Sequence, residues 1–248
     1  TPIAESGMVG IGIGAAMGGM HPMVEMMTIN FSFLALDQIV NSAAKLYHMS
    51  NGQINVPMVV RMASGGGSQL AATHSHSLEG LYAHFPGLKV VCPSNAADGK
   101  GLLKRAFRDQ NTVIFIEHTA NYALKGEVPD DPDFLVEFGV ANILREGTDV
   151  TIVGYGGSVH QATRAASLLH DQEDIDAEVI DLRTLRPLDI DTVVASVKKT
   201  NRCVIVEDAW RFGGFGGELS AQVMERAFDW LDAPVARVAC KDVPLPYN

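Results

Sequence analysis

The stretch Thr73–Leu103, THSHSLEGLYAHFPGLKVVCPSNAADGKGLL, predicts a loop, a helix, a tight turn, a short buried strand, a loop and a second helix. It begins with two histidines among small polar residues and continues through an amphipathic segment into an apolar run that ends at Cys92. Such a unit places side chains at the end of a parallel strand, where α/β proteins have their sites. The stretch therefore favours an α/β fold with a site at that edge of the sheet.

Apolar periodicity on both sides of this stretch predicts the same alternation of strands and helices. Strands are predicted at Met23–Met27, Val56–Arg61, Leu88–Cys92, Thr112–Glu117, Val150–Val153, Ala177–Asp181, Cys203–Glu207 and Val235–Ala239. Helices are predicted at Met8–Met20, Ser32–Tyr47, Leu102–Arg108, Val159–Asp171, Ile190–Thr200 and Glu218–Leu231. This order indicates two Rossmann-like parallel-sheet domains covered by helices on both faces. A Pro- and Asp-rich interruption predicts domains at 1–122 and 139–248, joined by a linker at 123–138.

Composition excludes several classes of protein. The formal net charge of −10, without a basic cluster, argues against binding to nucleic acid or to anionic lipid. No apolar run approaches the ~20 residues that span a bilayer, and no secretory leader is visible. The chain begins without Met in a turn-like segment and stops in an extended one, so we expect a longer protein. The three distant cysteines predict free thiols in a reducing cytoplasm: Cys92, Cys203 and Cys240.

Two glycine patterns allow a binding function or a purely structural one. Gly10-x-Gly12-x-x-Ala15 matches a dinucleotide fingerprint, but no strand precedes it, and close helix packing explains the same residues. Gly213–Gly217 could bind phosphate, but it lacks the lysine of a P-loop, and a surface loop is the alternative. A nicotinamide-dependent oxidoreductase therefore remains a competing hypothesis.

Several blocks of the sequence together resemble one family, the β subunit of the thiamine-diphosphate-dependent 2-oxoacid dehydrogenases, the E1 component of complexes such as pyruvate dehydrogenase. The resemblance covers essentially all of the chain in the family's order. It implies that 1–122 is a pyrimidine-binding domain and that 139–248 is a transketolase-like C-terminal domain. The blocks are TPIAESG (1–7), EMMTINFSFLALDQIVNSAAKLYHMSNG (25–52), VPMVVR (56–61), ATHSHS (72–77), HFPGLKVVCPSNAADGKGLL (84–103), AFRDQNTVIFIEH (106–118), DLRTLRPLD (181–189), VIVEDAWRFGGFGGELSAQV (204–223) and KDVPLPY (241–247).

The resemblance implies an α2β2 heterotetramer with thiamine diphosphate at the interface between an E1 α subunit and this chain. In the family the α subunit holds Mg²⁺ and the diphosphate through a GDG motif, and no GDG occurs in these 248 residues. The chain is therefore expected to be active only with an α subunit. The implied reaction is oxidative decarboxylation of a 2-oxoacid with acyl transfer to the lipoyl-bearing acyltransferase E2.

Pyruvate is the expected substrate, and a branched-chain 2-oxoacid or acetoin enzyme is the nearest alternative. An assembly subunit without a catalytic role is an alternative of another class. The expected location is the cytoplasm, or the mitochondrial matrix or a plastid in a eukaryote.

The resemblance also implies roles for single residues. Glu5 matches the glutamate that hydrogen-bonds N1′ of the cofactor's aminopyrimidine, although a carboxylate here also suits a helix start. His74 matches an active-site histidine that binds or protonates the 2-oxoacid or acts in acyl transfer, a role that suits imidazole. Met27 and Phe31 match residues that contact the aminopyrimidine ring, with core packing as the alternative. His76, two residues after His74, fits a polar loop better than a transition-metal site, because no third ligand is evident.

The turn FRDQN matches a potassium site of some relatives, and an Asx-type turn without an ion is the alternative. The implied ligands are the backbone carbonyls of Met58, Ala106, Phe107 and Asp109 and the side chain of Asn111. In the C-terminal half, contacts to other subunits or to E2 are expected from Asp208, Trp210, Arg211 and Phe212.

Overall fold

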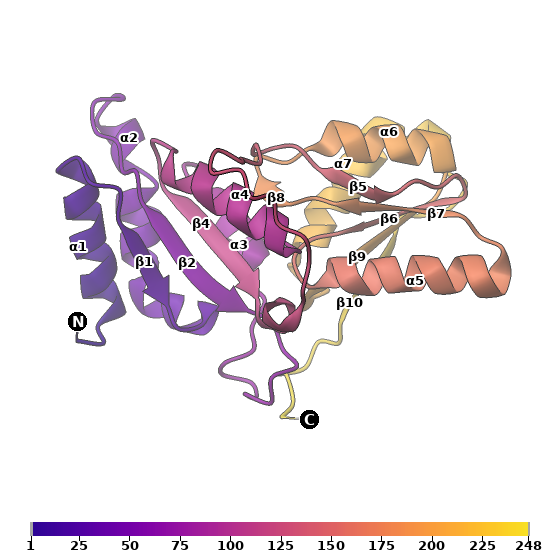
Figure 1. The fold of residues 1–248 in the computed structure, drawn as a ribbon, viewed down its shortest axis with the longest axis horizontal. Coiled ribbons are helices and arrows are strands. Elements are labelled where there is room, and N and C mark those ends of the chain that lie inside the picture. Colours follow the sequence, from indigo (N-terminus) through magenta and orange to yellow (C-terminus); the bar gives the residue numbers. More distant parts are fainter. Residues whose placement is uncertain (1, 248) are drawn as a thin grey trace.

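The computed structural model describes residues 2–247, which contain two five-stranded sheets lying beside each other (Figure 1). The first sheet has the order β1-β2-β4-β3-β8, formed by β1 (Met23–Met26), β2 (Val59–Ser64), β4 (Val113–His118), β3 (Lys89–Val91) and β8 (Thr184–Arg186). The second has the order β10-β9-β6-β7-β5, formed by β10 (Ala236–Cys240), β9 (Cys203–Trp210), β6 (Val150–Gly154), β7 (Ala177–Asp181) and β5 (Asn142–Arg145).

Parallel pairing dominates both sheets. The longest ladder joins β2 to β4, from Val59 opposite Val113 to Ser64 opposite His118. Only the terminal strands β8 and β5 pair antiparallel, with β3 and β7 respectively. The run 113–116 in β4 is buried on both faces, as expected for a parallel strand between helical layers. The predicted α/β fold with two parallel-dominated sheets is thus confirmed.

The helices of the first sheet differ from the prediction in type in one segment, and α1 and α4 both begin earlier than the predicted Met8 and Leu102. The elements are α1 (Glu5–Met17), the 3-10 helix η1 (Ile29–Ala35), the π-helix η2 (Gln38–Ala43), α2 (Leu46–Met49), α3 (Glu79–His84), α4 (Ala96–Phe107) and the 3-10 helix η3 (Thr119–Ala123). The single helix predicted over Ser32–Tyr47 is therefore wrong. The buried hydroxyl of Ser32 donates to the carbonyl oxygen of Ile29 and accepts a hydrogen bond from the Tyr82 hydroxyl. These bonds favour the tighter first turn, and the local apolar spacing could not reveal the distant tyrosine.

The second sheet carries α5 (Ser158–Glu173), α6 (Ile190–Thr200), α7 (Phe215–Ala227) and the 3-10 helix η4 (Phe228–Trp230). Helix α6 has the predicted bounds because both ends are marked locally. Asp189 accepts a hydrogen bond from the Thr192 amide at the start, and Asn201 adopts a left-handed conformation at the end. Helix α7 begins at Phe215, before the predicted Glu218, because the buried Glu207 carboxylate accepts the Gly216 amide in its first turn.

Strand β8 connects the two halves of the chain. The sequence predicts its residues only as an approach to α6, but they form the edge of the first sheet beside β3. The Cys92 amide donates to the carbonyl oxygen of Arg183, and the Arg183 guanidinium lies 2.8 Å from the buried carboxylate of Asp98 on α4. This connection holds the halves together at the carboxyl end of β3.

The predicted linker at 123–138 packs along α4. Lys100 and Lys104 of α4 donate to the carbonyl oxygens of Pro129 and Pro132. A Cβ at Gly101 would lie 2.6 Å from the Val136 side chain, so α4 and this segment are in close contact. The domain bounds themselves stay a prediction.

Two expectations from composition concern the whole chain. The three cysteines are free thiols, with Cys92 and Cys203 buried and Cys240 half-buried, as predicted. Among the helices formed by residues 2–247, none has the length and apolarity to cross a bilayer.

Candidate functional site

Four chain segments lie along the carboxyl-terminal edge of the first sheet. They are the amino-terminal end of α1, the exit from β1 into η1, the loop 65–78 that joins β2 to α3, and the end of β4 (Figure 1). Parallel strands expose their carboxyl ends along one edge, so residues that follow different strands become neighbours. The site residues predicted from the sequence lie on the first three of these segments.

Glu5 is the first residue of α1 and is half-buried. Its carboxylate makes no hydrogen bond or ion pair with the residues that the structure describes, and the preceding Ala4 provides no side-chain cap. The free amides at a helix start favour a negative charge there. The carboxylate is therefore stabilised where it stands and still has both oxygens available for a ligand.

Phe31 and His74 are brought together from segments more than forty residues apart. Their ring centroids lie 5.3 Å apart in an edge-to-face arrangement. The Phe31 amide donates to the carbonyl oxygen of Thr28, and the His74 amide donates to that of Ala71. Each of the two residues therefore belongs to a hydrogen-bonded backbone turn. Met27 lies just before η1, which carries Phe31, and 70% of the Met27 surface is exposed. Such exposure does not fit ordinary core packing, which was the alternative to a cofactor contact for Met27.

His76 has a structural role in contacts between the halves. Its ring lies 5.2 Å from that of Trp210 on β9 and 6.3 Å from that of Phe33, and its amide donates to the Asn30 side chain. Burial lowers the pKa of His76 below its ordinary value. Residues 2–247 contain no cluster of three His, Cys, Asp or Glu side chains that could bind a metal ion.

A third histidine at this edge, His118, is not among the residues singled out from the sequence. It ends β4, and its Nε2 lies 3.3 Å from the Asp208 carboxylate on β9. Burial lowers the pKa of His118, and the neighbouring carboxylate of Asp208 opposes that shift. A Cβ at Gly65 or at Gly157 would lie 2.0 or 2.5 Å from the His118 ring, so both glycines are required for this packing. The only signal in the sequence is the glycine content of two loops.

The turn FRDQN, predicted to bind potassium, has the Asx-type conformation that forms without an ion. The Asn111 amide donates to the Asp109 carboxylate at 2.9 Å, which is an Asx-type turn. The same buried carboxylate forms ion pairs with Lys89 and Arg105. The carbonyl oxygen of Met58 accepts the amide of Val113 in the β2–β4 ladder. A cation held by Met58, Ala106, Phe107, Asp109 and Asn111 remains a prediction.

The two glycine patterns have structural roles. Gly10 and Gly12 lie inside α1 rather than in a turn after a strand, and a Cβ at Gly12 would lie 2.8 Å from both Met58 and Val24. Close packing therefore explains this pattern, and the dinucleotide interpretation is wrong. In Gly213–Gly217, the Gly216 amide donates to the Glu207 carboxylate at 2.9 Å, so an acidic group of the chain itself occupies the position of a phosphate.

Comparison with known proteins agrees with this architecture. Residues 1–125 match the pyrimidine-binding domain of transketolase, and residues 139–248 match the transketolase C-terminal domain. A solved chain described as a split-gene transketolase, an inactive β4 tetramer, superimposes with a TM-score of 0.76 at 28% identity, covering 97% of this chain and 74% of that one. The fold and the edge site thus define a protein of the transketolase class.

Similar proteins of known name show which family within the transketolase class this chain resembles. Pyruvate dehydrogenase E1 component subunit β of Rhizobium meliloti is 51% identical over 100% of this chain and 54% of the relative. The subunit of the same name from Rickettsia felis is also 51% identical, over 100% of this chain and 75% of the relative. The chain belongs to the family of pyruvate dehydrogenase E1 component β subunits. It spans about half of the first relative's length and three quarters of the second's.

Proposed function

We propose that this chain is the catalytic β subunit of a 2-oxoacid dehydrogenase E1 component, with pyruvate as substrate. The observation that carries the proposal is the Glu5 carboxylate, which has no partner among the described residues. It lies on helix α1, which packs against η1, and η1 carries Phe31 of the Phe31–His74 pair. An assembly subunit would need neither an unpaired carboxylate nor an open aromatic pair at this edge. A branched-chain 2-oxoacid and acetoin are the alternative substrates.

The residues present fit an aminopyrimidine. The ring needs a carboxylate beside a ring nitrogen and an apolar or aromatic surface against its face, and Glu5, Met27 and Phe31 are residues of these types. Thiamine diphosphate, when bound, supplies an electron sink for the carbon from which CO₂ leaves. Glu5 would share a proton with N1′ of the pyrimidine, while Met27 and Phe31 would hold the ring and exclude water.

His74 would act on the substrate side of the site. Its Nδ1 lies 2.9 Å from the Thr73 hydroxyl, and its ring is supported by Phe31. These contacts orient the imidazole. The imidazole would hold the 2-oxoacid in place by hydrogen bonding and could transfer a proton near neutral pH. Mg²⁺ and the diphosphate would be held by the α subunit.

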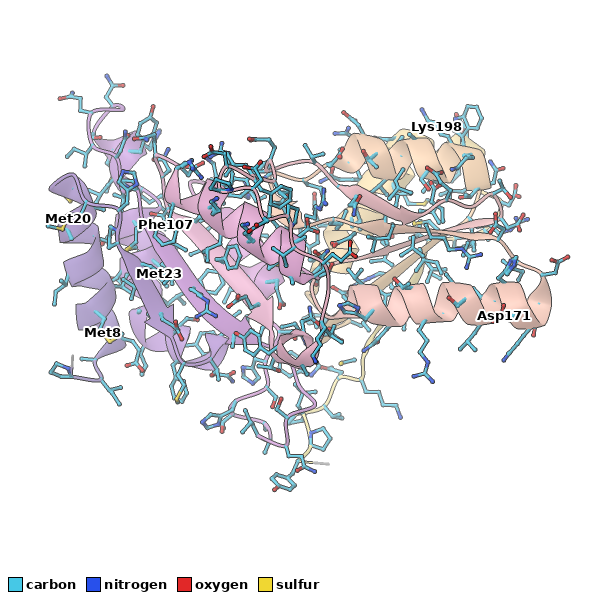
Figure 2. The ribbon with its side chains drawn as sticks, viewed as in Figure 1. Met8, Met20, Met23, Phe107, Asp171 and Lys198 are labelled. Atoms are coloured by element: carbon cyan, nitrogen blue, oxygen red, sulfur yellow. The ribbon has the colours of Figure 1, made fainter. Side chains whose placement is uncertain are left out.

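An exposed apolar surface on α1 and β1 supports the need for an α subunit or a second β subunit. Met8, Met20 and Met23 mark this side of the molecule in Figure 2. Strand β1 is an edge strand, and side chains around it remain uncovered. The exposed apolar residues are Ile3, Ile11, Met17, Met20, Met23 and Met27.

Of the four residues expected to contact other subunits or E2, Phe212 is the best candidate. It is 89% exposed, whereas Asp208 is paired with His118. Trp210 donates to the Val243 carbonyl oxygen, and Arg211 donates to that of Arg237. A location in the cytoplasm, or in the matrix or a plastid of a eukaryote, remains part of the proposal.

Reconstitution tests the proposal. The full-length β chain would be mixed with a GDG-bearing α subunit, thiamine diphosphate and Mg²⁺, and ferricyanide reduction would be followed with pyruvate and with 3-methyl-2-oxobutanoate. We expect activity that needs both chains and the cofactor, with pyruvate faster. Acetoin would be tested in the same assay, and a heterotetramer that forms and is inactive with all three compounds would favour the assembly-subunit alternative.

Phe31→Ala is expected to weaken thiamine diphosphate binding about fivefold, because the aromatic contact is worth on the order of 1 kcal/mol. The dissociation constant would be measured by titration calorimetry on the α–β complex. Phe33→Ala is the matched control, since Phe33 lies nearby but contacts His76 instead. Equal affinities of the two variants would remove Phe31 from the cofactor site.

Potassium is expected to stabilise the chain through the turn at Asp109 and Asn111. At a concentration of about ten times its dissociation constant, the ion would add about 1.4 kcal/mol to the free energy of unfolding. The measurement is the melting temperature in KCl against NaCl at equal ionic strength. Asn111→Ala should remove the difference and the exposed neighbour Gln110→Ala should keep it. No difference for the unmodified chain would leave the Asx turn as the full explanation.

A further inference from the structure

A hydrogen bond closes the base of the loop that carries His74. Ser64 is the last residue of β2 and Glu79 is the first residue of α3, so these two residues flank the loop 65–78. The Ser64 hydroxyl donates to Oε1 of Glu79 at 2.7 Å. One residue further in, the Gly65 amide donates to the carbonyl oxygen of His76 at 3.1 Å. Ser64 and Glu79 are both buried, at 4% and 5% exposure.

Glu79 differs from the other buried carboxylates around it. Arg237 pairs with Glu207 and His118 pairs with Asp208. Within residues 2–247, Glu79 has no ion pair, and its Oε2 has no hydrogen-bond partner. Burial, with some contribution from the charges of Asp208 and Glu207, raises the pKa of Glu79 to about 7. Its described partner is therefore an uncharged hydroxyl rather than a cation.

The rest of the loop has a conformation that needs such support. Gly65, Gly67, Gln69 and Ala71 all have positive φ angles, and for Gln69 and Ala71 the side chain makes this backbone conformation unfavourable. Elsewhere the loop is held by the contacts of His76 with Trp210 and Asn30 near its base, and by the hydrogen bond from the Ser68 hydroxyl to the Thr119 hydroxyl. A loosened base would let the segment between these points relax and move His74 away from Phe31.

We propose that Ser64 and Glu79 form a clamp that fixes the base of the loop 65–78, and that Glu79 is thereby a positioning residue for His74. The clamp is a property of this chain. Its consequence for catalysis rests on the proposed function. A hydrogen bond that is buried suits this role, because salt in the solvent screens it little.

Amide hydrogen exchange tests the clamp in the assembled α–β complex. The reporters are the bonded amides of Gly65, His74 and His76. Glu79→Leu removes the acceptor at similar size, Ser64→Ala removes the donor, and Glu79→Gln keeps a neutral acceptor. We expect exchange about tenfold faster in the first two variants and near the unmodified rate in the third. The double variant should exchange no faster than either single variant, because both remove the same bond.

Ser77→Ala is the matched control, because the Ser77 hydroxyl is buried in the same loop and makes no hydrogen bond with the described residues. Its exchange should equal that of the unmodified chain. The clamp is overturned if Ser64→Ala leaves exchange unchanged, or if Glu79→Gln exchanges as fast as Glu79→Leu. The first criterion holds even if Glu79→Leu fails to fold, and Glu79→Gln is then compared with Ser64→Ala instead.

Measuring kcat of the same variants distinguishes a failure of the clamp from a failure of the proposed function. If exchange and kcat change together across the variants, both ideas are supported. Faster exchange with unchanged kcat would sustain the clamp and would count against the role of His74 in the proposed reaction.

Discussion

Glu5→Gln is expected to lower kcat of the reconstituted complex by at least about a hundredfold, the usual contribution of a positioned acid–base group. Glutamine has the size of glutamate and can still hydrogen-bond, but it cannot share a proton with the pyrimidine nitrogen. The prediction rests on the position of Glu5 at the start of α1 with no partner for its carboxylate among the described residues. Thiamine diphosphate affinity should change much less than kcat.

Glu25→Gln provides the control for this substitution. Glu25 lies on β1, is exposed, and forms an ion pair with Arg61. The control variant should keep the activity of the unmodified complex, because an exposed ion pair contributes little. If Glu5→Gln decarboxylates the 2-oxoacid as fast as Glu25→Gln, the catalytic role of Glu5 is wrong.

Glu79→Gln is expected to stabilise the chain at neutral and alkaline pH but not at acidic pH. The pKa of Glu79 rises from 4.5 to about 7 on folding, mainly because of burial. Between these values the native state binds the proton more tightly than the unfolded state, so stability is lost as pH rises through this window. Glutamine carries no such charge. The gain in unfolding free energy should therefore be near zero below pH 4.5 and level off at about 3 kcal/mol above pH 7.

Urea unfolding of the full-length chain at a series of pH values measures this difference. Glu225→Gln, at an exposed position on α7, is the control and should follow the unmodified chain at every pH. A gain for Glu79→Gln that does not vary with pH would contradict the buried-acid interpretation, because an effect of packing alone has no reason to titrate.

Local signals in the sequence explain which elements were predicted with the right bounds. Strand β7 and helix α6 agree at both ends. The β-branched pair Val179–Ile180 of β7 and the Asp189 cap of α6 both act within a few residues, so they can be recognised without the rest of the fold. The same holds for the candidate residues Glu5, Met27, Phe31 and His74, which lie in recognisable blocks next to predicted strands and helix starts.

The features that the sequence did not predict correctly depend on contacts between residues that are distant along the chain. The helix predicted over 32–47 has the right apolar spacing, yet the Tyr82–Ser32 contact favours a 3-10 turn at its start. The segment 184–186 has no strand pattern of its own and becomes β8 because β3 offers an open edge. His118 was missed because its partner Asp208 and the glycines that make room for it come from three other parts of the chain.

By itself the sequence determined the α/β fold with two parallel-dominated sheets, the family, and the types of residue available for catalysis. These follow from periodicities and motifs that are written within short stretches. Only the tertiary structure decided that β8 joins the halves, that His118 pairs with Asp208, and that Glu79 is buried beside the His74 loop with no cation among residues 2–247 paired to it. The physical reason is that burial and pairing depend on neighbours distant along the chain, and those neighbours alone set the electrostatic environment of each group.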